Sequence, residues 1–329
     1  MLKKLIFFAG VLVLSLEAAP RDPFKQIDDL LPTPDEQRRA SGAPGPGYWQ
    51  QQVDYVIDVE LDEVNHRITG SEKITYHNNS KDTLDYLWMQ LDQNLYNPKM
   101  IAAQSRTTSG ISSLSFNAFE GLLQAQEFDG GYKITAVKDA SGNPLKHVIV
   151  QTMMRIIPPS PVKPGQKITF SVDWNFNIVD ATKMRSRMGY EYFKEDKNHL
   201  YALAQWFPRM CAYTDVNGWQ NKQYLGSGEF ALEFGDYLVR ITAPADHIVA
   251  STGELQNPEK ILTKEQRSRL AKARNSKKPV FIVNLEEAKA NEKQKAKGKK
   301  TWVYKADNVR DFAFASSRKF LWDAMGVDL

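Results

Sequence analysis

The sequence has little cysteine: Cys211 is the one cysteine among 329 residues. An internal disulfide needs two cysteines and a cysteine-rich zinc module needs several, so both are excluded. A buried structural thiol is the ordinary interpretation of an isolated cysteine. Glycine (19 residues) and proline (16 residues) occur at about average frequency, which excludes collagen-like and low-complexity chains. With 42% hydrophobic residues, a chain of this length can bury a large core in one or two domains.

No apolar run in the sequence reaches the length of a membrane-spanning helix. The nearest is the twelve-residue stretch 5–16, which follows two lysines, whereas a spanning helix needs about 20 residues. A positive start, a short apolar run and small residues at Ala18 and Ala19 are typical of a secretory signal. We predict a signal peptide over 1–19 and export to the periplasm or extracellular space. Contact with a membrane is expected only through an uncleaved signal, which is the alternative.

Positive charge is concentrated in one segment. Between 260 and 300 there are fourteen Lys and Arg against four Asp and Glu, while the whole chain has a net charge of +4. The rest of the chain is therefore net negative, which argues against a nucleic-acid-binding surface, and no nucleic-acid partner is expected. The segment could bind an anionic surface, but a solvated, partly helical insertion over 257–300 is the favoured interpretation. A helix is expected from Leu262 to Arg274, capped by Thr263.

Most of the chain before this segment alternates with a period of two. Residues 53–61 and 68–76 place apolar side chains on every second position around a polar turn, which predicts a β-hairpin. Glu72 interrupts the apolar face of the second strand, which leaves its burial open. Residues 168–176 place three aromatic side chains on one face, and such a face must meet a thick core. Further strands are expected over 86–91, 145–151, 230–234, 237–242, 248–251, 302–305 and 311–316.

These elements predict a mainly β protein with an antiparallel, sandwich-like domain. The Pro- and Gly-rich stretch 20–47 precedes the first strand and is expected to be a tether, because Pro and Gly break regular structure. The β-rich domain is expected over 48–256, and strands return over 301–329 after the basic insertion.

A search for chemistry finds no complete catalytic motif. The histidines are His66, His77, His147, His199 and His247, and no two are four residues apart, so a His-Glu-x-x-His zinc helix is absent. No nucleophile elbow, phosphate loop or dinucleotide fingerprint occurs. Paired carboxylates could serve glycoside hydrolysis, but only their separation in space would decide that; the candidates are Asp215, Glu229, Glu233 and Asp236.

Gln205 is unusual because its amide lies within a run of large aromatic residues, Tyr201 to Met210. An amide has both an acceptor oxygen and a donor NH₂, which suits it to orient a polar ligand group. An amide that pins a loop to the backbone is an equally good interpretation from the residues alone.

Several blocks, in order, resemble the N-terminal domain of aminopeptidase-N-like zinc peptidases. They are Gly47-Tyr48-Trp49, residues 53–59, 68–72, 204–209, 215–219, 228–237, 241–247 and 250–253. The resemblance implies a saddle-shaped, largely antiparallel β-domain that precedes a thermolysin-like catalytic domain, and residues 301–329 would include the start of that domain. In the family, zinc is held by the His-Glu-x-x-His helix and a downstream Glu, and a Gly-x-Met-Glu-Asn strand binds the substrate amine. The nearest match to that strand, Gly226-Ser227-Gly228-Glu229-Phe230, lacks the Met and the Asn. No catalytic or metal-binding residue is therefore assigned in this chain.

The resemblance gives Gln205 a role. In the family the N-terminal domain provides an amide that receives the free amino terminus of the substrate, and Gln205 matches this position through Ala204 and Pro208. Phe207 stands where the family has an acidic residue, which is a departure from the pattern.

The sequence therefore predicts the N-terminal, non-catalytic portion of an exported zinc aminopeptidase. Zinc belongs to the full-length protein, and this chain alone is expected to bind none and to be inactive. Its partners would be the amino terminus of a peptide and a C-terminal catalytic domain. A stand-alone periplasmic β-sandwich module that binds peptide or carbohydrate is the alternative. The first hypothesis expects exposed apolar side chains near the C-terminus, from Phe320 to Met325.

Overall fold

The computed structural model describes residues 34–99, 115–116, 127–184, 186–226, 231–293 and 295–327. The predicted signal peptide, 1–19, and the first part of the predicted tether lie outside these residues. The chain divides into two compact units, Met1–Tyr48 and Trp49–Leu329. In the first unit the described residues form a tight turn, in which Arg38 and Pro44 make an isolated bridge. The guanidinium of Arg38 lies over the ring of Tyr48 at 5.3 Å.

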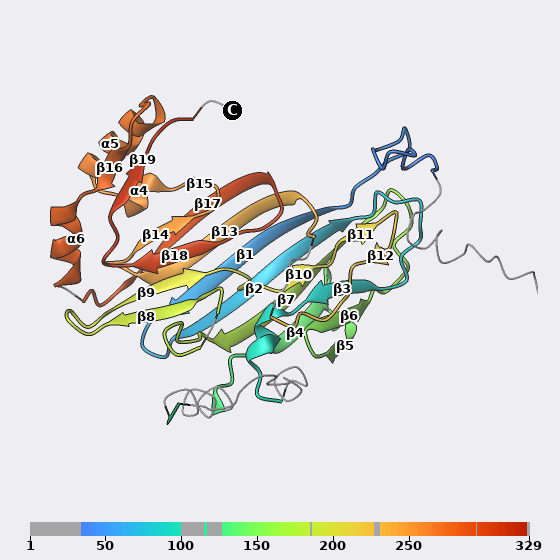
Figure 1. The fold of residues 1–329 in the computed structure, drawn as a ribbon, viewed down its shortest axis with the longest axis horizontal. Coiled ribbons are helices and arrows are strands. Elements are labelled where there is room, and N and C mark those ends of the chain that lie inside the picture. Colours follow the sequence, from blue (N-terminus) through green and yellow to red (C-terminus); the bar gives the residue numbers. More distant parts are fainter. Residues whose placement is uncertain are drawn as a thin grey trace, which may run out of the picture. The chain divides into compact units, whose positions relative to one another are not determined.

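The second unit is built on a seven-stranded sheet with the order β15-β17-β13-β1-β2-β7-β4 (Figure 1). The predicted hairpin is confirmed, because β1 and β2 pair antiparallel with Val59 opposite Gly70. One pair departs from the expected antiparallel pattern: β1 and β13 run parallel, which the long stretch of chain between them permits. The strands are β1 (Gln52–Asp62), β2 (Arg67–His77), β4 (Lys133–Asp139), β7 (Lys167–Asn177), β13 (Gly235–Pro244), β15 (Glu254–Leu255) and β17 (Lys299–Val309).

The inner face of this sheet follows the period-two pattern of the sequence. Phe170, Trp174 and Phe176 of β7 are all buried, as their spacing predicts. Trp174 packs directly on Gly70, where a Cβ atom would lie 2.4 Å from the indole ring, so only glycine fits there. Glu72 is 1% exposed and its carboxylate has no hydrogen-bond partner in the described part of the chain. Burial raises its pKa well above the usual value, so this interruption of the apolar face is accommodated as a neutral acid.

Smaller sheets complete the unit. One has the order β10-β3-β6-β5 and another β14-β18-β9-β8, while β11–β12 and β16–β19 form two-stranded pairs. The predicted strands over 86–91, 145–151 and 248–251 correspond to β3, β5 and β14. The bounds are β3 (Leu87–Gln90), β5 (Lys146–Val150), β6 (Met153–Ile157), β8 (Gly189–Phe193), β9 (Asn198–Leu203), β10 (Arg209–Met210), β11 (Tyr213–Thr214), β12 (Gly218–Trp219), β14 (Ile248–Ser251), β16 (Val280–Val283), β18 (Phe314–Ser317) and β19 (Trp322–Ala324).

The expected strand over 230–234 is not formed in its described part. Residues 227–230 lie outside the described chain, and Phe234 makes only an isolated bridge to Gln52. The strand begins at Gly235 instead. At this residue the backbone comes so close to Val53 that a Cβ atom would lie 1.7 Å from its carbonyl oxygen. Glycine permits this close approach.

The basic segment is partly helical, as predicted. It contains α4 (Pro258–Ile261), α5 (Lys264–Arg274) and α6 (Leu285–Glu292), which lie together at one end of the unit (Figure 1). Thr263 caps α5 and forms a capping box with Gln266. The last helix, α6, ends at Glu292. The amide of Ala296, beyond this end, donates to the Asp246 carboxylate at 2.8 Å. No described helix is long and apolar enough to cross a membrane.

Candidate functional site

Gln205 lies two residues after the end of β9, in a backbone conformation that few residues adopt. Its φ is 54°, in the left-handed region that favours glycine. The other described non-glycine residues with positive φ are explained by tight turns between paired strands or by the irregular end of β17: His66, Gln151, Lys197 and Asn308. Gln205 is in no hairpin, so its conformation has a different cause.

Side chains from other parts of the unit hold this conformation. The carbonyl of Gln205 accepts hydrogen bonds from Nε2 of Gln93 at 2.8 Å and from the hydroxyl of Tyr132 at 3.3 Å. The next residue, Trp206, is fully buried and donates its indole N–H to the carbonyl of Phe312 at 2.8 Å. These contacts fix the backbone on both sides of Gln205. The side-chain amide itself makes no hydrogen bond to any residue that the structure describes.

Gln205 borders a cavity of about 260 Å³, called here the Gln205 pocket. Its lining is mainly polar and charged, in contrast to the core beneath it. The lining residues are Arg187, Ala204, Gln205, Arg209, Leu232, Arg310 and Asp311.

Arg209 forms the floor of this pocket and is tied to two carboxylates. Its Nε and Nη2 donate to Oδ2 of Asp92 at 3.2 and 2.8 Å, and Nη1 donates to Oδ2 of Asp311 at 2.7 Å. Burial opposes the charged form of Arg209, but the two carboxylates outweigh it and raise the guanidinium pKa. The Asp92 side chain is 1% exposed, whereas that of Asp311 is 42% exposed. The ion pair of Arg209 with Asp92 is therefore shielded from solvent, whereas its ion pair with Asp311 is open to solvent.

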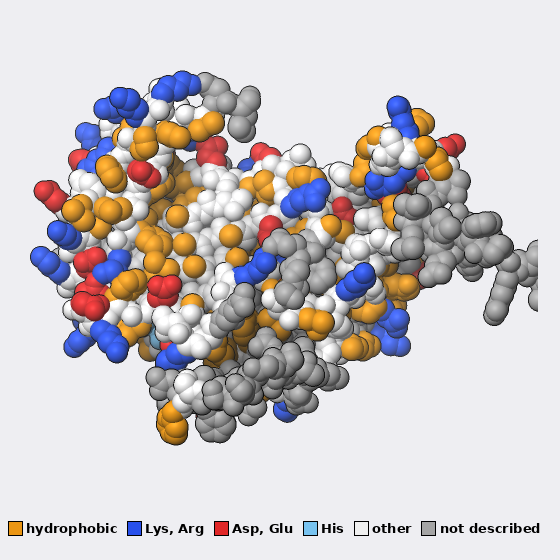
Figure 2. Space-filling model, in the orientation of Figure 1, with side chains coloured by type: hydrophobic (Ala, Val, Ile, Leu, Met, Phe, Trp, Pro, Cys, Tyr) orange, Lys and Arg blue, Asp and Glu red, His pale blue; other side chains and the backbone are white. Residues whose placement is uncertain are grey.

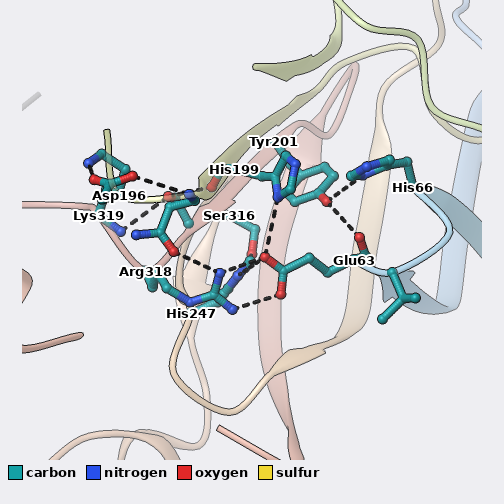
Figure 3. Close-up of polar contacts among 12 residues, drawn as sticks. Glu63, His66, Asp196, His199, Tyr201, His247, Ser316, Arg318 and Lys319 are labelled. Atoms are coloured by element: carbon teal, nitrogen blue, oxygen red, sulfur yellow. Dashed lines mark hydrogen bonds and ion pairs between the residues drawn. The ribbon is translucent and has the colours of Figure 1, made fainter. Parts of the chain in front are cut away.

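A second polar cluster brings together three of the five histidines, but it has a different character (Figure 3). Arg318 donates to both carboxylate oxygens of Glu63, at 2.5 and 2.7 Å, and its Nε donates to Asp246 at 3.1 Å. Nitrogens of His199 and His247 lie 3.6 and 3.7 Å from Oε1 of Glu63. No local sequence pattern pointed to these histidines, because they come from three separate parts of the chain.

The edge of this Glu63 cluster is also closed by contacts within the chain. Nδ1 of His66 lies 2.8 Å from the Tyr201 hydroxyl, and Nδ1 of His247 lies 2.9 Å from the Ser316 hydroxyl. The His66 ring stacks on Tyr190 with centroids 4.0 Å apart.

The Glu63 cluster does not fit a zinc ion. Both oxygens of Glu63 are already bound by the Arg318 guanidinium, and a fixed positive charge at the centre repels a cation. Across the described residues no group of three or more His, Cys, Asp or Glu side chains could hold a metal ion. The cluster joins the β1–β2 turn to β9 and β18, so its geometry is that of a structural brace.

Of the carboxylates considered for glycoside chemistry, Asp215, Glu233 and Asp236 do not line the Gln205 pocket. Glu233 accepts from the amide of Tyr213 at 2.8 Å, and Asp236 is exposed and accepts from the amide of Asn308 at 2.9 Å. Glu229 lies outside the described residues. Cys211 is buried, as the structural interpretation expects.

A larger hollow of about 480 Å³ lies between β14, β15, β17 and α5 and is lined mostly by apolar groups, among them Leu255, Leu270, Tyr304 and Trp322. Figure 2 shows hydrophobic side chains gathered over this region. Nearby, Leu321 and Met325 are about half exposed. The charged groups among its described lining residues, Glu254 and Arg274, form an ion pair with each other.

Comparisons with known proteins give structural neighbours only, because no protein-family model and no curated protein matches the sequence. Similar solved structures include an M1 zinc metallopeptidase from Deinococcus radiodurans (10% identity, TM-score 0.38, 83% of this chain and 43% of that chain). Another is a mutant of an M1 zinc metallopeptidase from the same organism bound to a Tyr-Ser-Ala substrate (10% identity, TM-score 0.40, 81% of this chain and 42% of that chain). A third is a two-domain M1 zinc metallopeptidase mutant bound to L-tryptophan (10% identity, TM-score 0.40, 83% of this chain and 44% of that chain).

This chain spans less than half the length of those structures. Scores at this level do not place it in a family, so its function is argued from its own residues.

The sequence singled out Gln205 as a candidate but did not indicate the groups around it. Asp92 and Asp311 are 117 and 102 residues from Arg209, and no local pattern links them. The one available signal was Arg209 itself. A guanidinium among large aromatic residues is expected to be buried, and a buried charge needs a partner of opposite charge.

Proposed function

We propose that this chain is the N-terminal, non-catalytic portion of an exported zinc-dependent aminopeptidase, in which Gln205 receives the amino terminus of a peptide. A catalytic domain elsewhere in the full-length protein would hold the zinc and hydrolyse the N-terminal peptide bond. The ordered sequence blocks that resemble aminopeptidase-N-like enzymes support this proposal, and the mainly β fold agrees with it. Within the described ranges no group of side chains is suited to hold zinc, and the role proposed for this chain is binding and orientation.

One observation carries the proposal: the side-chain amide of Gln205 borders a pocket while its backbone is fixed by Gln93 and Tyr132. An amide oxygen without an internal partner can accept a hydrogen bond from an ammonium group. The Asp311 carboxylate, in the same pocket, adds negative charge for that ammonium. Fixing the acceptor in advance lowers the entropy cost of binding.

Direct binding tests this role. Calorimetry with Ala-Ala-Ala amide should show association with the chain, and N-acetylation of the peptide should abolish it, because the acetyl group removes the ammonium. Gln205→Ala should weaken binding of the free peptide about tenfold, the value of one hydrogen bond to a charged group. Gln256→Ala, a change at an exposed glutamine outside the pocket, is the matched control. Equal affinity for the free and acetylated peptides would remove Gln205 from amine recognition.

The relation to a zinc enzyme is tested by the intact mass and metal content of the native protein. A species heavier than 37.4 kDa that carries about one zinc per molecule supports the aminopeptidase. A native species of this size or smaller without zinc supports the alternative, a stand-alone periplasmic module that binds peptide or carbohydrate.

A further inference from the structure

The Gln205 pocket contains more positive than negative charge. Arg187, Arg209 and Arg310 line it together with one carboxylate, that of Asp311. Arg209 is neutralised inside the protein by Asp92 and Asp311. The remaining arginines therefore determine which charged groups a ligand can bring into the pocket.

Arg310 is the guanidinium available to a ligand. It is exposed, and its guanidinium lies over the ring of Phe234 at 4.4 Å. The guanidinium makes no hydrogen bond and no ion pair with any residue in the described ranges. A guanidinium presents a planar fork of N–H donors that matches the two oxygens of a carboxylate. Arg310 is thus suited to bind a carboxylate that enters from solvent.

The chain on either side of Arg310 is held in place. The carbonyl of Arg310 accepts from the hydroxyl of Tyr237 at 3.3 Å. The Asp311 carboxylate accepts from the amide of Phe312 at 2.9 Å and from Arg209 at 2.7 Å. The donor at Arg310 and the acceptors at Gln205 and Asp311 are therefore presented to one pocket by a fixed backbone.

The size of the pocket limits the ligand portion that can enter. A volume of about 260 Å³ is below the 300–1,000 Å³ typical of sites for drug-sized molecules, so it suits a single amino-acid residue. A residue complementary to this lining has an ammonium group for Gln205 and Asp311 and a carboxylate for Arg310.

We propose that the Gln205 pocket selects peptides whose N-terminal residue is Asp or Glu, with the α-ammonium at Gln205 and the side-chain carboxylate at Arg310. This inference rests on the proposed function, because it takes the position of the amine from there. A free amino acid carries the same pair of charges through its α-carboxylate, and the test separates the two ligands.

The test compares Glu-Ala-Ala amide with Gln-Ala-Ala amide by calorimetry at low salt. The two peptides differ only in the side-chain charge, and the C-terminal amide removes the other carboxylate. The expected result is about tenfold tighter binding of the Glu peptide, which corresponds to about 1.4 kcal/mol. Arg310→Gln should abolish this difference without changing the affinity for the Gln peptide. Arg240→Gln, at an exposed arginine of β13 outside the pocket, should preserve it.

The outcomes distinguish this inference from the proposed function. Equal binding of both peptides overturns the acidic preference and leaves amine recognition intact. Binding of N-acetyl-Glu-Ala-Ala amide as tightly as the free peptide overturns both. Free glutamine that binds as tightly as the Glu peptide overturns the peptide assignment. Thermal unfolding of Arg310→Gln at the wild-type temperature supports the inference by showing that the lost preference is not a loss of fold.

Discussion

Arg318 and Arg209 are both buried guanidiniums between two carboxylates, yet their surroundings differ. Arg318 is bound by Glu63 and Asp246, whose side chains are 17% and 8% exposed. A further bond from Arg318 to the amide oxygen of Asn198, at 3.2 Å, uses another of its donors. The donors of Arg318 are therefore bound by groups of the protein itself, and these contacts join elements that are far apart in the sequence.

The second carboxylate of Arg209 is instead open to solvent. Asp311 faces the Gln205 pocket, and the amide of Gln205 beside it has no partner in the described structure. Polar groups that satisfy one another stabilise a fold, whereas fixed polar groups without partners can bind a ligand. The difference between the two regions therefore separates a brace from the proposed binding site.

The largest expected effect comes from opening the Glu63 cluster. Arg318→Met leaves Glu63 and Asp246 buried without their cation, and loss of one partner of a buried ion pair costs about 3–5 kcal/mol. Urea unfolding should show this loss at pH 7. Peptide affinity of the folded variant should not change, because Arg318 does not line the Gln205 pocket.

Arg240→Met is the control for Arg318→Met. Arg240 pairs with Asp58 at 3.1 Å on the surface, where an ion pair contributes about 0–1 kcal/mol. If both variants lost the same free energy of unfolding, the Glu63 cluster would not be a brace.

Glu233, a carboxylate outside both regions, should make the stability of the fold depend on pH. Burial raises the pKa of Glu233 to about 7, against the opposing hydrogen bond from Tyr213 and the charge of Arg310. Because the folded pKa lies above the unfolded value, this residue's contribution is complete below about pH 4.5 and is lost as the pH rises through 7. Glu233→Gln should remove that loss, so that between pH 5 and pH 8 the variant gains about 2 kcal/mol relative to wild type.

Urea titrations at the two pH values measure the gain. Glu191→Gln, at an exposed position of β8, should keep the wild-type pH dependence. A parallel pH dependence of Glu233→Gln and wild type would contradict the raised pKa.

A smaller effect is expected in the Glu63 cluster on acidification. Burial lowers the pKa of both His66 and His199, although the charge of Glu63 opposes this. Their folded pKa values lie below the unfolded value near 6.5, so stability is complete above that pH and falls as the pH drops below it. Melting temperatures between pH 7.5 and 5.5 should fall less for His199→Gln than for wild type.

His147→Gln is the matched control for His199→Gln, since His147 lies on the exposed strand β5. It should retain the full wild-type decrease. An identical decrease in all three proteins would show that His199 does not titrate differently on folding.

The sequence predicted what depends on local spacing. The hairpin at β1 and β2, the aromatic face of β7 and the Thr263 cap follow from residues within one turn or strand, and the structure confirms each. The parallel pairing of β1 with β13 depends on two segments about 180 residues apart, and no local pattern contains it. The same holds for the convergence of His66, His199 and His247 on Glu63.

Gln205 itself was found from its position in an aromatic run, but its strained backbone could not be predicted. The positive φ depends on Gln93 and Tyr132, whose side chains reach Gln205 only after the sheets have packed. Alternation predicts which face is buried and does not predict which polar group is left without a partner.

The smallest expected change in stability is at Gln205, and it is the sharpest test of the contrast. Gln205→Gly should stabilise the folded state, because glycine adopts the left-handed conformation without the steric cost of a side chain. It should also destabilise the protein, because glycine increases the conformational entropy of the unfolded chain. These terms oppose each other, so the free energy of unfolding should change by less than about 1 kcal/mol. Binding of Gln-Ala-Ala amide should nevertheless weaken about tenfold, because the acceptor is gone.

Asn198→Ala is the counterpart of Gln205→Gly in the Glu63 cluster. It removes a buried amide bonded to Arg318 and to the carbonyl of Glu292, so it should cost more stability, about 1–3 kcal/mol, without changing peptide affinity. Unfolding and calorimetry should therefore show opposite patterns: Gln205→Gly loses peptide affinity with little change in stability, and Asn198→Ala loses stability with no change in affinity. A stability loss at Gln205→Gly as large as at Asn198→Ala would mean that the Gln205 amide supports the fold, and the distinction between brace and binding site would fail at this residue.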